Sequence, residues 1–336
     1  MKIAVDAMGG DFAPVEIVKG AVKAAREYKC EIVLVGNKAV LHVLAGKHLK
    51  DLGISIVDAP QVITFDEHPI EALRNKPKSS IVLGINLLKQ GKVDAFVSAG
   101  STGAVFGAAL LTLGKSKWVE RPAIASIINL GQNVMPFMLV DAGANADCRA
   151  YHLLQFALMG NLYAQRIFGL ENPRVGLLSN GSEATKGNRL VVETHQLLKQ
   201  SGLNFIGNVE GNDIVHSKAE VVVTDGFTGN ILLKAMEGLG ESLIKLKPVH
   251  GSLPNQRLTG RALLADVGMS FLIKGMDYSE YGGASLLGIN GNVIISHGRS
   301  KAKAIKNAIG LARRSAERDV PKFMNEVQYE PQNTTV

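Results

Sequence analysis

Two glycine-rich turns in the sequence have the composition of anion-binding loops. The first is Ser98–Gly103 (SAGSTG), which precedes a predicted helix ending at Leu113. The second is Asp225–Asn230 (DGFTGN), which precedes a predicted helix reaching Leu243. Free backbone N–H groups at a helix start, assisted by Ser, Thr or Asn side chains, can hold a phosphate without a dedicated cation. The alternative for both turns is ordinary N-capping, which uses the same residue types.

A third turn supplies cations. Lys186 and Arg189 flank Gly187 and Asn188 just before another predicted helix. A cation in this place neutralises a phosphate or the oxyanion that develops on a carbonyl under attack. The alternative is a pair of solvated surface residues.

Many predicted strands end alike, with a polar residue followed by small ones. The endings are Asp6-Ala7, Ser98-Ala99-Gly100, Asp141-Ala142-Gly143, Ser179-Asn180-Gly181, Asp225-Gly226 and His297-Gly298. In open parallel sheets, ligands bind beyond the carboxyl ends of the strands. The pattern therefore predicts a crevice site at that edge, with ordinary turn chemistry as the alternative.

Short runs rich in Val and Ile alternate with longer runs of helical spacing. The predicted strands are 2–6, 31–35, 94–98, 137–141, 174–179, 220–225 and 293–297. The predicted helices are 15–27, 80–90, 102–113, 150–168, 188–200 and 301–318. This alternation indicates an α/β fold in which a mostly parallel sheet is covered on both faces.

The length of 336 residues suits one large α/β domain or two small ones, and we expect a single catalytic domain over 1–336. The stretch 246–275 breaks the strand–helix rhythm and is interpreted as a protruding excursion. Residues 328–336 are polar and are expected to form a frayed tail.

Composition and motifs exclude several classes. The two cysteines, Cys30 and Cys148, match no disulfide or zinc pattern, and the GxGxxG, GxSxG and HExxH motifs are missing. The start of the chain does not resemble a signal peptide, and no long uncharged apolar run occurs, so a cytoplasmic protein is expected. The net charge of +7 favours anionic partners. The alternative is that this surplus only keeps the protein soluble. Nucleic acid is disfavoured because basic patches interleaved with aromatic residues are lacking.

The sequence resembles the phosphate acyltransferases of bacterial phospholipid synthesis over roughly residues 1–320. The motifs that carry the resemblance are Asp6–Asp11 (DAMGGD), Ser98–Ala104, Arg121–Ala123, Lys186–Asn188, Val223–Asn230, Tyr281–Ala284 and His297-Gly298. Two positions depart from the family pattern. Ser101 stands where the family usually has Asn, so a shorter hydroxyl replaces an amide there, and Ala142 replaces a Val, which is a packing change.

The resemblance implies a fold and an activity. The fold would be a three-layer α/β/α Rossmann-like domain, akin to phosphotransacetylases and isocitrate-dehydrogenase-type enzymes. The activity would be transfer of a long-chain fatty acyl group from acyl-[acyl carrier protein] to inorganic phosphate, with no cofactor. It also implies a homodimer and a peripheral position at the inner face of the cell membrane, where a membrane glycerol-3-phosphate acyltransferase consumes the acyl phosphate.

With phosphate as the nucleophile, the site residues receive roles by hypothesis. Lys186 would stabilise phosphate or the oxyanion, and Asn188 and Asn230 would orient substrate. The phosphate cradle would be formed by Ser101, Thr102 and Gly103. Gly229 and Asp225 are further substrate-binding positions, and Asp225 is expected to hold its turn. His297 is the last such position, either as a proton relay or as a structural residue. Two rivals stay open: a phosphotransacetylase-like enzyme using acyl-coenzyme A, and a non-catalytic protein that binds acyl phosphate or a lipid surface.

Two basic segments have alternative interpretations. In the excursion, an apolar stripe and nearby cations fit either an anionic bilayer or a buried helix in the dimer interface or core. These residues are Leu258, Leu263, Leu264, Val267, Phe271 and Leu272, with Lys245, Lys247, Arg257 and Arg261. The second segment is either a solvated helix face or a dock for the acidic carrier protein. Its basic residues are Lys301, Lys303, Lys306, Arg313 and Arg314.

Overall fold

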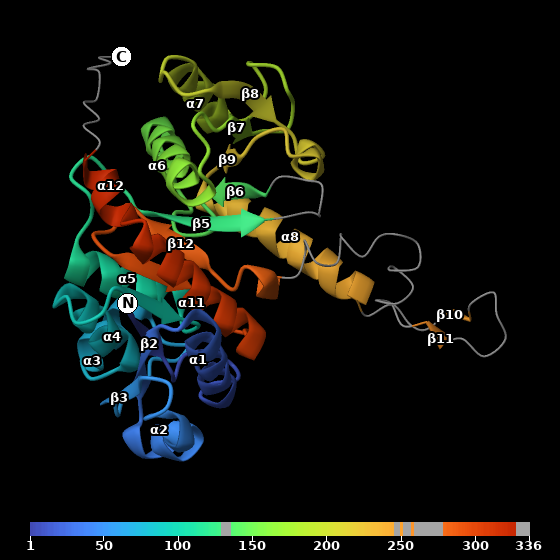
Figure 1. Cartoon of the computed structure of the whole chain (residues 1–336). Coiled ribbons are helices and arrows are strands. Elements are labelled where there is room, and N and C mark those ends of the chain that lie inside the picture. The colour runs from blue at the N-terminus through green and yellow to red at the C-terminus, as the bar shows by residue number, and fades with distance from the viewer. Residues whose placement is uncertain (129–135, 245–248, 251–256, 259–277, 327–336) are drawn as a thin grey trace. The chain divides into compact units, whose positions relative to one another are not determined.

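The computed structural model describes residues 1–128, 136–244, 249–250, 257–258 and 278–326 (Figure 1). The chain divides into two compact units. The first comprises Met1–Ile124, Gln165–Leu170 and Tyr281–Val336, and the second comprises Ala125–Ala164 and Glu171–Glu280. Each unit has its own strands and helices.

The first unit contains a mostly parallel group of strands in the order β3-β2-β1-β4-β13-β12. Their bounds are Ile54–Asp58, Glu31–Gly36, Lys2–Asp6, Ala95–Ser98, Asn292–Ile295 and Ala284–Leu287. All neighbours are parallel except β12, which runs antiparallel to β13. The central strands β1 and β4 are buried along almost their whole length, as expected for parallel strands covered on both faces.

Helices pack on these strands in two groups. Helices α1 and α11 pack together, as do α3, α4 and α5, while α4 and α11 both contact β1 and β4. The α1–α11 contact is close because Gly20 has no side chain, and a Cβ there would lie 2.6 Å from Cβ of Ile305. The helices of this unit are α1 (Val15–Tyr28), α2 (Lys38–Ala45), η1 (Gly46–His48), α3 (Pro69–Asn75), α4 (Ser80–Lys89), α5 (Thr102–Leu113), α11 (Ala302–Glu317) and α12 (Val320–Glu326).

The second unit has strands in the order β5-β6-β9-β7-β8. They are Ala123–Ile128, Phe137–Val140, Val221–Val223, Val175–Leu178 and Phe205–Val209, and only the β5–β6 pair is antiparallel. The helices are α6 (Ala150–Phe168), α7 (Arg189–Lys199), η2 (Asp213–His216), α8 (Gly226–Ile244) and η3 (Tyr278–Glu280). The first two residues of β5 and the last four of α6 are counted with the first unit. A short antiparallel pair, β10 (Val249–His250) and β11 (Arg257–Leu258), follows α8 in the chain.

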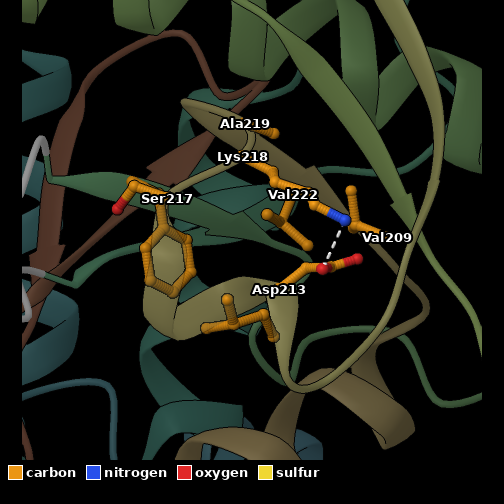
Figure 2. Close-up of a pocket in the computed structure, with 8 residues that line it drawn as sticks. Val209, Asp213, Ser217, Lys218, Ala219 and Val222 are labelled. Carbon is orange, nitrogen blue, oxygen red and sulfur yellow. Dashed lines mark ion pairs between the residues drawn. The ribbon is translucent and has the colours of Figure 1, made fainter.

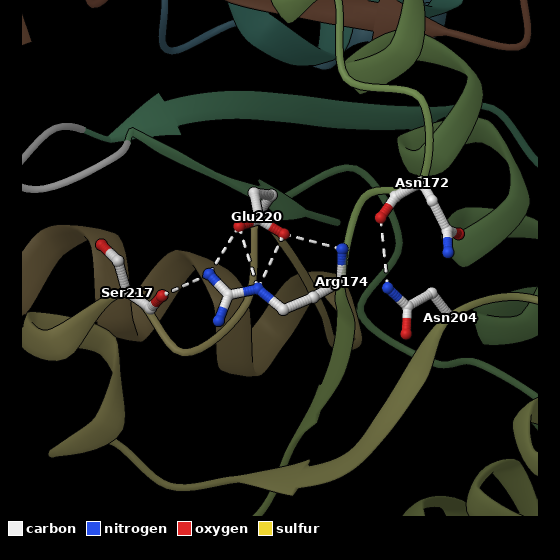
Figure 3. Close-up of polar contacts among 5 residues, drawn as sticks. All are labelled: Asn172, Arg174, Asn204, Ser217 and Glu220. Atoms are coloured by element: carbon white, nitrogen blue, oxygen red, sulfur yellow. Dashed lines mark hydrogen bonds and ion pairs between the residues drawn. The ribbon is translucent and has the colours of Figure 1, made fainter.

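An ion pair joins the starts of β7 and β9 in the second unit (Figure 3). The Arg174 guanidinium donates to both carboxylate oxygens of Glu220, at 2.5–3.1 Å, and to the carbonyl oxygen of Ser217 at 3.1 Å. The backbone N–H of Arg174 also donates to Glu220, at 2.7 Å. Burial alone would raise the pKa of Glu220, but the bonds from Arg174 outweigh burial and hold that pKa below its usual value.

The fold class predicted from the sequence is confirmed: the structure is mixed α/β with a mostly parallel strand arrangement. Every predicted strand and helix is present, with ends that differ by one or two residues. The interpretation of 1–336 as one catalytic domain stays a prediction. The excursion 246–275, apart from β10 and β11, and the tail 328–336 lie outside the described residues.

Candidate functional site

Three turns meet at the carboxyl edge of the strands in the first unit. Strands β1, β4 and β13 are parallel neighbours, so the turns that follow them lie at the same edge. The N–H of Asp11 donates to the carbonyl oxygen of Gly298 at 2.8 Å, and the N–H of Ser296 donates to that of Ser98 at 2.8 Å. Turns 6–11, 98–103 and 296–300 therefore form one cluster.

The carboxylate of Asp6 holds two turns of this cluster together through hydrogen bonds. The side chain is buried, and one carboxylate oxygen accepts from the N–H groups of Met8 and Gly9, both at 3.1 Å. The other oxygen accepts from the Ser98 hydroxyl at 2.7 Å, and that hydroxyl accepts from the N–H of Gly100 at 3.0 Å. Burial raises the pKa of Asp6, while these hydrogen bonds act in the opposite direction.

Glycine at position 9 is required by the close approach of two turns. A Cβ on Gly9 would lie 2.3 Å from Asp6 Oδ2 and 2.7 Å from the backbone nitrogen of Gly100. Any side chain there would push the turn of 98–103 away from Asp6. The backbone of this turn is therefore held in place by both hydrogen bonds and packing.

The predicted phosphate cradle lies at the start of α5. Ser101 is buried and its hydroxyl makes no capping bond, while Thr102 and Gly103 are exposed. The first N–H groups of a helix have no intrahelical acceptor, so these positions offer donors to a ligand. His297 lies in the neighbouring turn, where its Nδ1 accepts from the N–H of Arg299 at 3.0 Å. That bond gives His297 a structural role in its turn.

A second cluster lies at the carboxyl edge of the second unit, around Asp141. This buried carboxylate accepts from the N–H groups of Gly143, Ala144 and Asn145 at 2.8–3.1 Å, and from the Asn145 amide at 2.8 Å. These hydrogen bonds shape the loop of 141–145.

The 141–145 loop packs directly on the first turn of α8, and glycines make this possible. A Cβ on Gly229 would lie 2.0 Å from the carbonyl oxygen of Asp141, and one on Gly226 would lie 2.7 Å from backbone atoms of Asn145. The N–H of Gly226 also donates to the carbonyl oxygen of Asn145 at 2.8 Å. Gly143 has a φ of +140°, and the amide nitrogen of Asn230 is 2.6 Å from where its Cβ would lie.

Asp225 bonds across the turn at the start of α8. Its carboxylate accepts from the N–H and the hydroxyl of Thr228, both at 2.8 Å. The first of these bonds satisfies an N–H group of the first turn of α8. The exposed side chain of Asn230 follows one turn later.

Lys186 and Asn188 lie in the turn after β7, which is the parallel neighbour of β9. Asn188 caps α7, because its side-chain oxygen accepts from the N–H of Val191 at 3.0 Å. Lys186 is exposed, and within the described residues its ammonium makes no hydrogen bond or ion pair. Arg189 is paired with Glu193 at 2.6 Å. Lys186 is therefore the cation that this turn offers to an anion.

The predicted site residues thus fall into two local clusters, one in each unit. Ser101, Thr102, Gly103 and His297 lie together in the first, while Lys186, Asn188, Asp225, Gly229 and Asn230 lie on neighbouring turns in the second. Sequence analysis did not identify Asp6 and Asp141 as the residues that hold the two clusters of turns together. A pattern in the sequence could have indicated them, since both strands end in Asp-Ala with glycine one or two residues later.

Figure 2 shows a small cavity elsewhere in the second unit, between the start of β6, η2 and β9. Its volume is about 10 Å³, and an ion pair between Lys218 and Asp213, 2.5 Å long, lies beside it. This volume is enough for about one water molecule, so the cavity is too small for a substrate.

Among the described residues, no group of His, Cys, Asp and Glu side chains is arranged to hold a metal ion. No helix in the described part of the chain combines the length and apolar character needed to cross a bilayer.

Comparison with known proteins identifies relatives along nearly the whole chain. Residues 1–323 match the family model described as "Fatty acid synthesis protein". The phosphate acyltransferase of Dehalococcoides mccartyi is 58% identical over 97% of this chain and 94% of its own length. That of Pelotomaculum thermopropionicum is 50% identical over 94% of this chain and 92% of its own.

Solved structures agree on the fold. A phosphotransacetylase from Streptococcus pyogenes matches with a TM-score of 0.63 at 19% identity, covering 94% of each chain. A branched-chain phosphotransacylase from Enterococcus faecalis matches with a TM-score of 0.55 at 15% identity, covering 94% of this chain and 98% of its own. The predicted phosphotransacetylase-like fold is thereby confirmed. On the family match and the sequence identity, this chain belongs to the fatty acid synthesis protein family, as an acyltransferase whose curated relatives are phosphate acyltransferases.

Proposed function

We propose that this acyltransferase moves a long-chain fatty acyl group from acyl-[acyl carrier protein] to inorganic phosphate, releasing free carrier protein and acyl phosphate for phospholipid synthesis. The phosphate oxygen attacks the thioester carbonyl, the C–S bond breaks, and the thiol leaves as a thiolate. A thiol has a pKa of about 8.5, so it departs without strong acid assistance. Such a reaction needs positioning and charge stabilisation more than a protein nucleophile.

The observation that carries the proposal is the exposed, unpaired ammonium of Lys186 at the edge that also bears the start of α8. A cation beside backbone donors supports the binding of a phosphate and the stabilisation of an oxyanion. Asn188 and Asn230 contribute amide groups that orient the substrate, and Gly229 lets the 141–145 loop approach α8. Asp225 supports the turn.

In the first unit, the start of α5 supports a second anion-binding role. Ser101, Thr102 and Gly103 present two hydroxyl groups and helix-start N–H groups, next to the turn that the Asp6–Ser98 bond holds fixed. Ser101 retains a hydroxyl where relatives of the resembled family usually have an amide. His297 positions its turn, and its Nε2 is the ring atom from which a proton relay would operate.

One assay tests the proposal directly. The purified chain is incubated with palmitoyl-[acyl carrier protein] with and without inorganic phosphate, and acyl phosphate is trapped with hydroxylamine while free thiol is measured with a thiol-reactive dye. We expect thiol release and hydroxamate in equal amounts, both dependent on phosphate. Thiol release without phosphate, or no release at all, would contradict the proposal.

A second candidate keeps the chemistry and changes the donor to acyl-coenzyme A, as the phosphotransacetylase-like fold allows. The two are separated by comparing kcat/KM for the same acyl group on the two carriers. We expect the carrier-protein thioester to be preferred. A preference for the coenzyme A thioester would support the alternative.

The surface of the first unit supports the choice of a protein donor. A groove of about 350 Å³ between α1 and α11 is lined by Lys23, Arg26, Lys303 and Lys306 together with Glu27. Clustered cations attract an acidic partner and speed its association. We therefore assign the acidic carrier protein to this groove. Of the neighbouring cations, Arg314 is exposed, while Arg313 is partly exposed and is paired with Glu317.

Homodimer formation is part of the same proposal. Helix α8 exposes Phe227, Ile231 and Leu239 on positions four and eight residues apart, with exposed fractions of 54–62%. An exposed apolar stripe on a helix is typical of a surface that pairs with another protein. Sedimentation velocity of the wild type and of an Ile231→Glu variant tests this: we expect a dimer that the charged residue disrupts.

We also propose a cytoplasmic position with peripheral contact at the inner face of the membrane, where a glycerol-3-phosphate acyltransferase would consume the acyl phosphate. Most of the segment expected to contact lipid, 246–275, lies outside the described residues. Its basic and apolar composition supports the proposal. Flotation with anionic vesicles is expected to retain the protein, and neutral vesicles serve as the control.

A further inference from the structure

Two phenylalanines are exposed at the carboxyl edge of the first unit. Phe12 has an exposed fraction of 41% and Phe65 of 55%. Single exposed apolar residues are normal in proteins, but a group of them beside polar backbone marks a binding surface. Here both lie next to the same hydrogen bond, between Asp11 and Gly298.

The ring of Phe65 lies directly against Gly298. A Cβ on that glycine would be 2.9 Å from Cζ of Phe65, so the missing side chain leaves room for the ring. Phe12 follows Asp11 in the chain, and its ring lies 5.1 Å from the ammonium of Lys301. The two rings therefore border turns 6–11 and 296–300, which belong to the same cluster as the predicted phosphate cradle.

The loop that carries Phe65 is held in place despite its exposure. Glu67 accepts from the N–H of Thr64 at 2.8 Å, from the Thr64 hydroxyl at 3.0 Å and from the ammonium of Lys76 at 2.6 Å. The bond from Lys76, followed by that from the Thr64 N–H, lowers the pKa of Glu67 to about 2. The loop keeps this ion pair throughout the neutral range, so Phe65 is presented on a fixed support.

The segment after this loop is packed along α5. Pro69 lies against Gly103, where a Cβ would be 2.8 Å from its Cγ, and Ile70 lies against Gly107 at 3.3 Å. The side chain of Ile70 is itself 40% exposed. The segment that follows the Phe65 loop is therefore packed on the first turns of α5, where the predicted phosphate cradle lies.

We propose that Phe12 and Phe65 form the binding surface for the acyl chain of the substrate. The inference rests on the proposed function for the identity of the substrate as an acyl thioester. A fatty acyl thioester joins a hydrocarbon chain to a polar carbonyl, and the structure places exposed aromatic rings beside backbone donors. The hydrocarbon of the acyl group packs against the two rings and is thereby removed from water. The thioester carbonyl then lies at the glycine-rich turns. Each methylene that leaves water improves binding by about 0.8 kcal/mol, or about fourfold.

The test is the dependence of turnover on chain length. Butanoyl, octanoyl and dodecanoyl thioesters are offered on carrier protein and on coenzyme A, and kcat/KM is measured for the wild type, Phe65→Ala, Phe12→Ala and Phe65→Leu. In the wild type, kcat/KM is expected to rise with each added methylene. In the two alanine variants the rise becomes shallower, with dodecanoyl kcat/KM reduced about tenfold and butanoyl kcat/KM changed by less than about twofold. Phe65→Leu keeps most of the dependence.

Leu111→Ala is the matched control. Leu111 is 71% exposed and lies on α5, but nine residues from its start, which is about 13 Å along the helix axis. This variant is expected to match the wild type at every chain length. The proposal would be overturned if Phe65→Ala and Phe12→Ala kept the chain-length dependence of the wild type. It would also be overturned if these variants sedimented as a smaller species than the wild type, because the rings would then be a subunit contact.

A binding measurement separates this proposal from the proposed function. Titration calorimetry with octanoyl- and dodecanoyl-coenzyme A, without phosphate, reports on the acyl site alone. Tighter binding of the longer chain in the wild type, lost in Phe65→Ala, supports the acyl site even where no acyl phosphate forms. Equal affinities for the two chains in the wild type would overturn it even where transfer occurs.

Discussion

The hydroxyl of Ser98 donates a 2.7 Å hydrogen bond to the buried carboxylate of Asp6, 92 residues earlier in the chain. The same hydroxyl accepts from the N–H of Gly100, so one atom links the turn after β1 to the turn after β4. This link fixes the backbone that leads to Ser101 and the first turn of α5. Removing it should therefore affect both stability and phosphate binding.

We predict that Ser98→Ala lowers the free energy of unfolding by about 1–3 kcal/mol, because a carboxylate oxygen and an N–H group lose their partner in a buried place. It should also raise KM for phosphate. Thermal unfolding followed by the fluorescence of Trp118, the single tryptophan, measures the first effect. Ser116→Ala is the control, since the Ser116 hydroxyl is buried and has no partner among the described residues. Equal losses in the two variants would contradict the role of the Asp6–Ser98 bond.

The glycines at the start of α8 provide a second test. Gly229→Ala places a Cβ 2.0 Å from the carbonyl oxygen of Asp141, so the 141–145 loop must move away from α8. We predict destabilisation by about 1–3 kcal/mol, which is typical of overpacking, together with loss of activity. Gly238→Ala lies on the same helix with no atom within 4 Å of the new Cβ. That variant should be neutral or up to about 1 kcal/mol more stable, because alanine is the better helix former.

Much of this fold was predictable from the sequence because its central strands are buried on both faces. Within the predicted strands 2–6 and 31–35, residues 3–5 and 32–35 are therefore uninterrupted apolar runs. Strands β3 and β8 were missed because they lie at the ends of the strand order and have mixed burial, which leaves no run to detect. Strands β5 and β12 were also missed, and both belong to the antiparallel pairs that strand–helix alternation does not predict.

The candidate site was predictable in part. The turns of 98–103 and 225–230 were identified by composition, because glycine, serine and threonine before a helix carry a local signal. The contacts of Asp6 with Ser98, and of Asp141 with the loop against Gly229, depend on which strands become neighbours. Sequence spacing does not carry that information. For the same reason Phe65 was not identified, since its neighbour Gly298 is far away in the chain.

Lys186 gives a prediction about rate rather than stability. Its ammonium makes no hydrogen bond or ion pair with the described residues, so Lys186→Ala should leave the unfolding midpoint unchanged. If it stabilises charge in the transition state, kcat falls about a hundredfold or more. Lys199→Ala, an exposed lysine at the end of α7, is the charge-matched control. An unchanged kcat in Lys186→Ala would remove this residue from the reaction.

The Arg174–Glu220 pair predicts how stability depends on pH. Although burial acts in the opposite direction, the bonds from Arg174 hold the pKa of Glu220 below 4.5 in the folded chain. The unfolded state binds the proton more readily, so the contribution is complete above pH 4.5 and is lost as the pH falls through the lower folded value. Urea unfolding between neutral and acidic pH measures this. Glu220→Gln should be less stable at neutral pH, and its stability should fall less on acidification; parallel curves would contradict the assignment.

The groove between α1 and α11 predicts a selective loss of affinity for a protein donor. Lys23→Glu and Lys303→Glu reverse two of the charges that line it, so an acidic carrier protein meets repulsion where it met attraction. We expect KM for acyl-[acyl carrier protein] to rise about tenfold. This rise should be smaller at high salt, because screening weakens charge interactions. The KM for a small acyl thioester should stay unchanged, since the substitutions lie on an outer helix face. Lys89→Glu, an exposed lysine at the end of α4, carries the same change in net charge elsewhere on this unit. A similar rise in Lys89→Glu would show that net charge, and not this groove, governs the association.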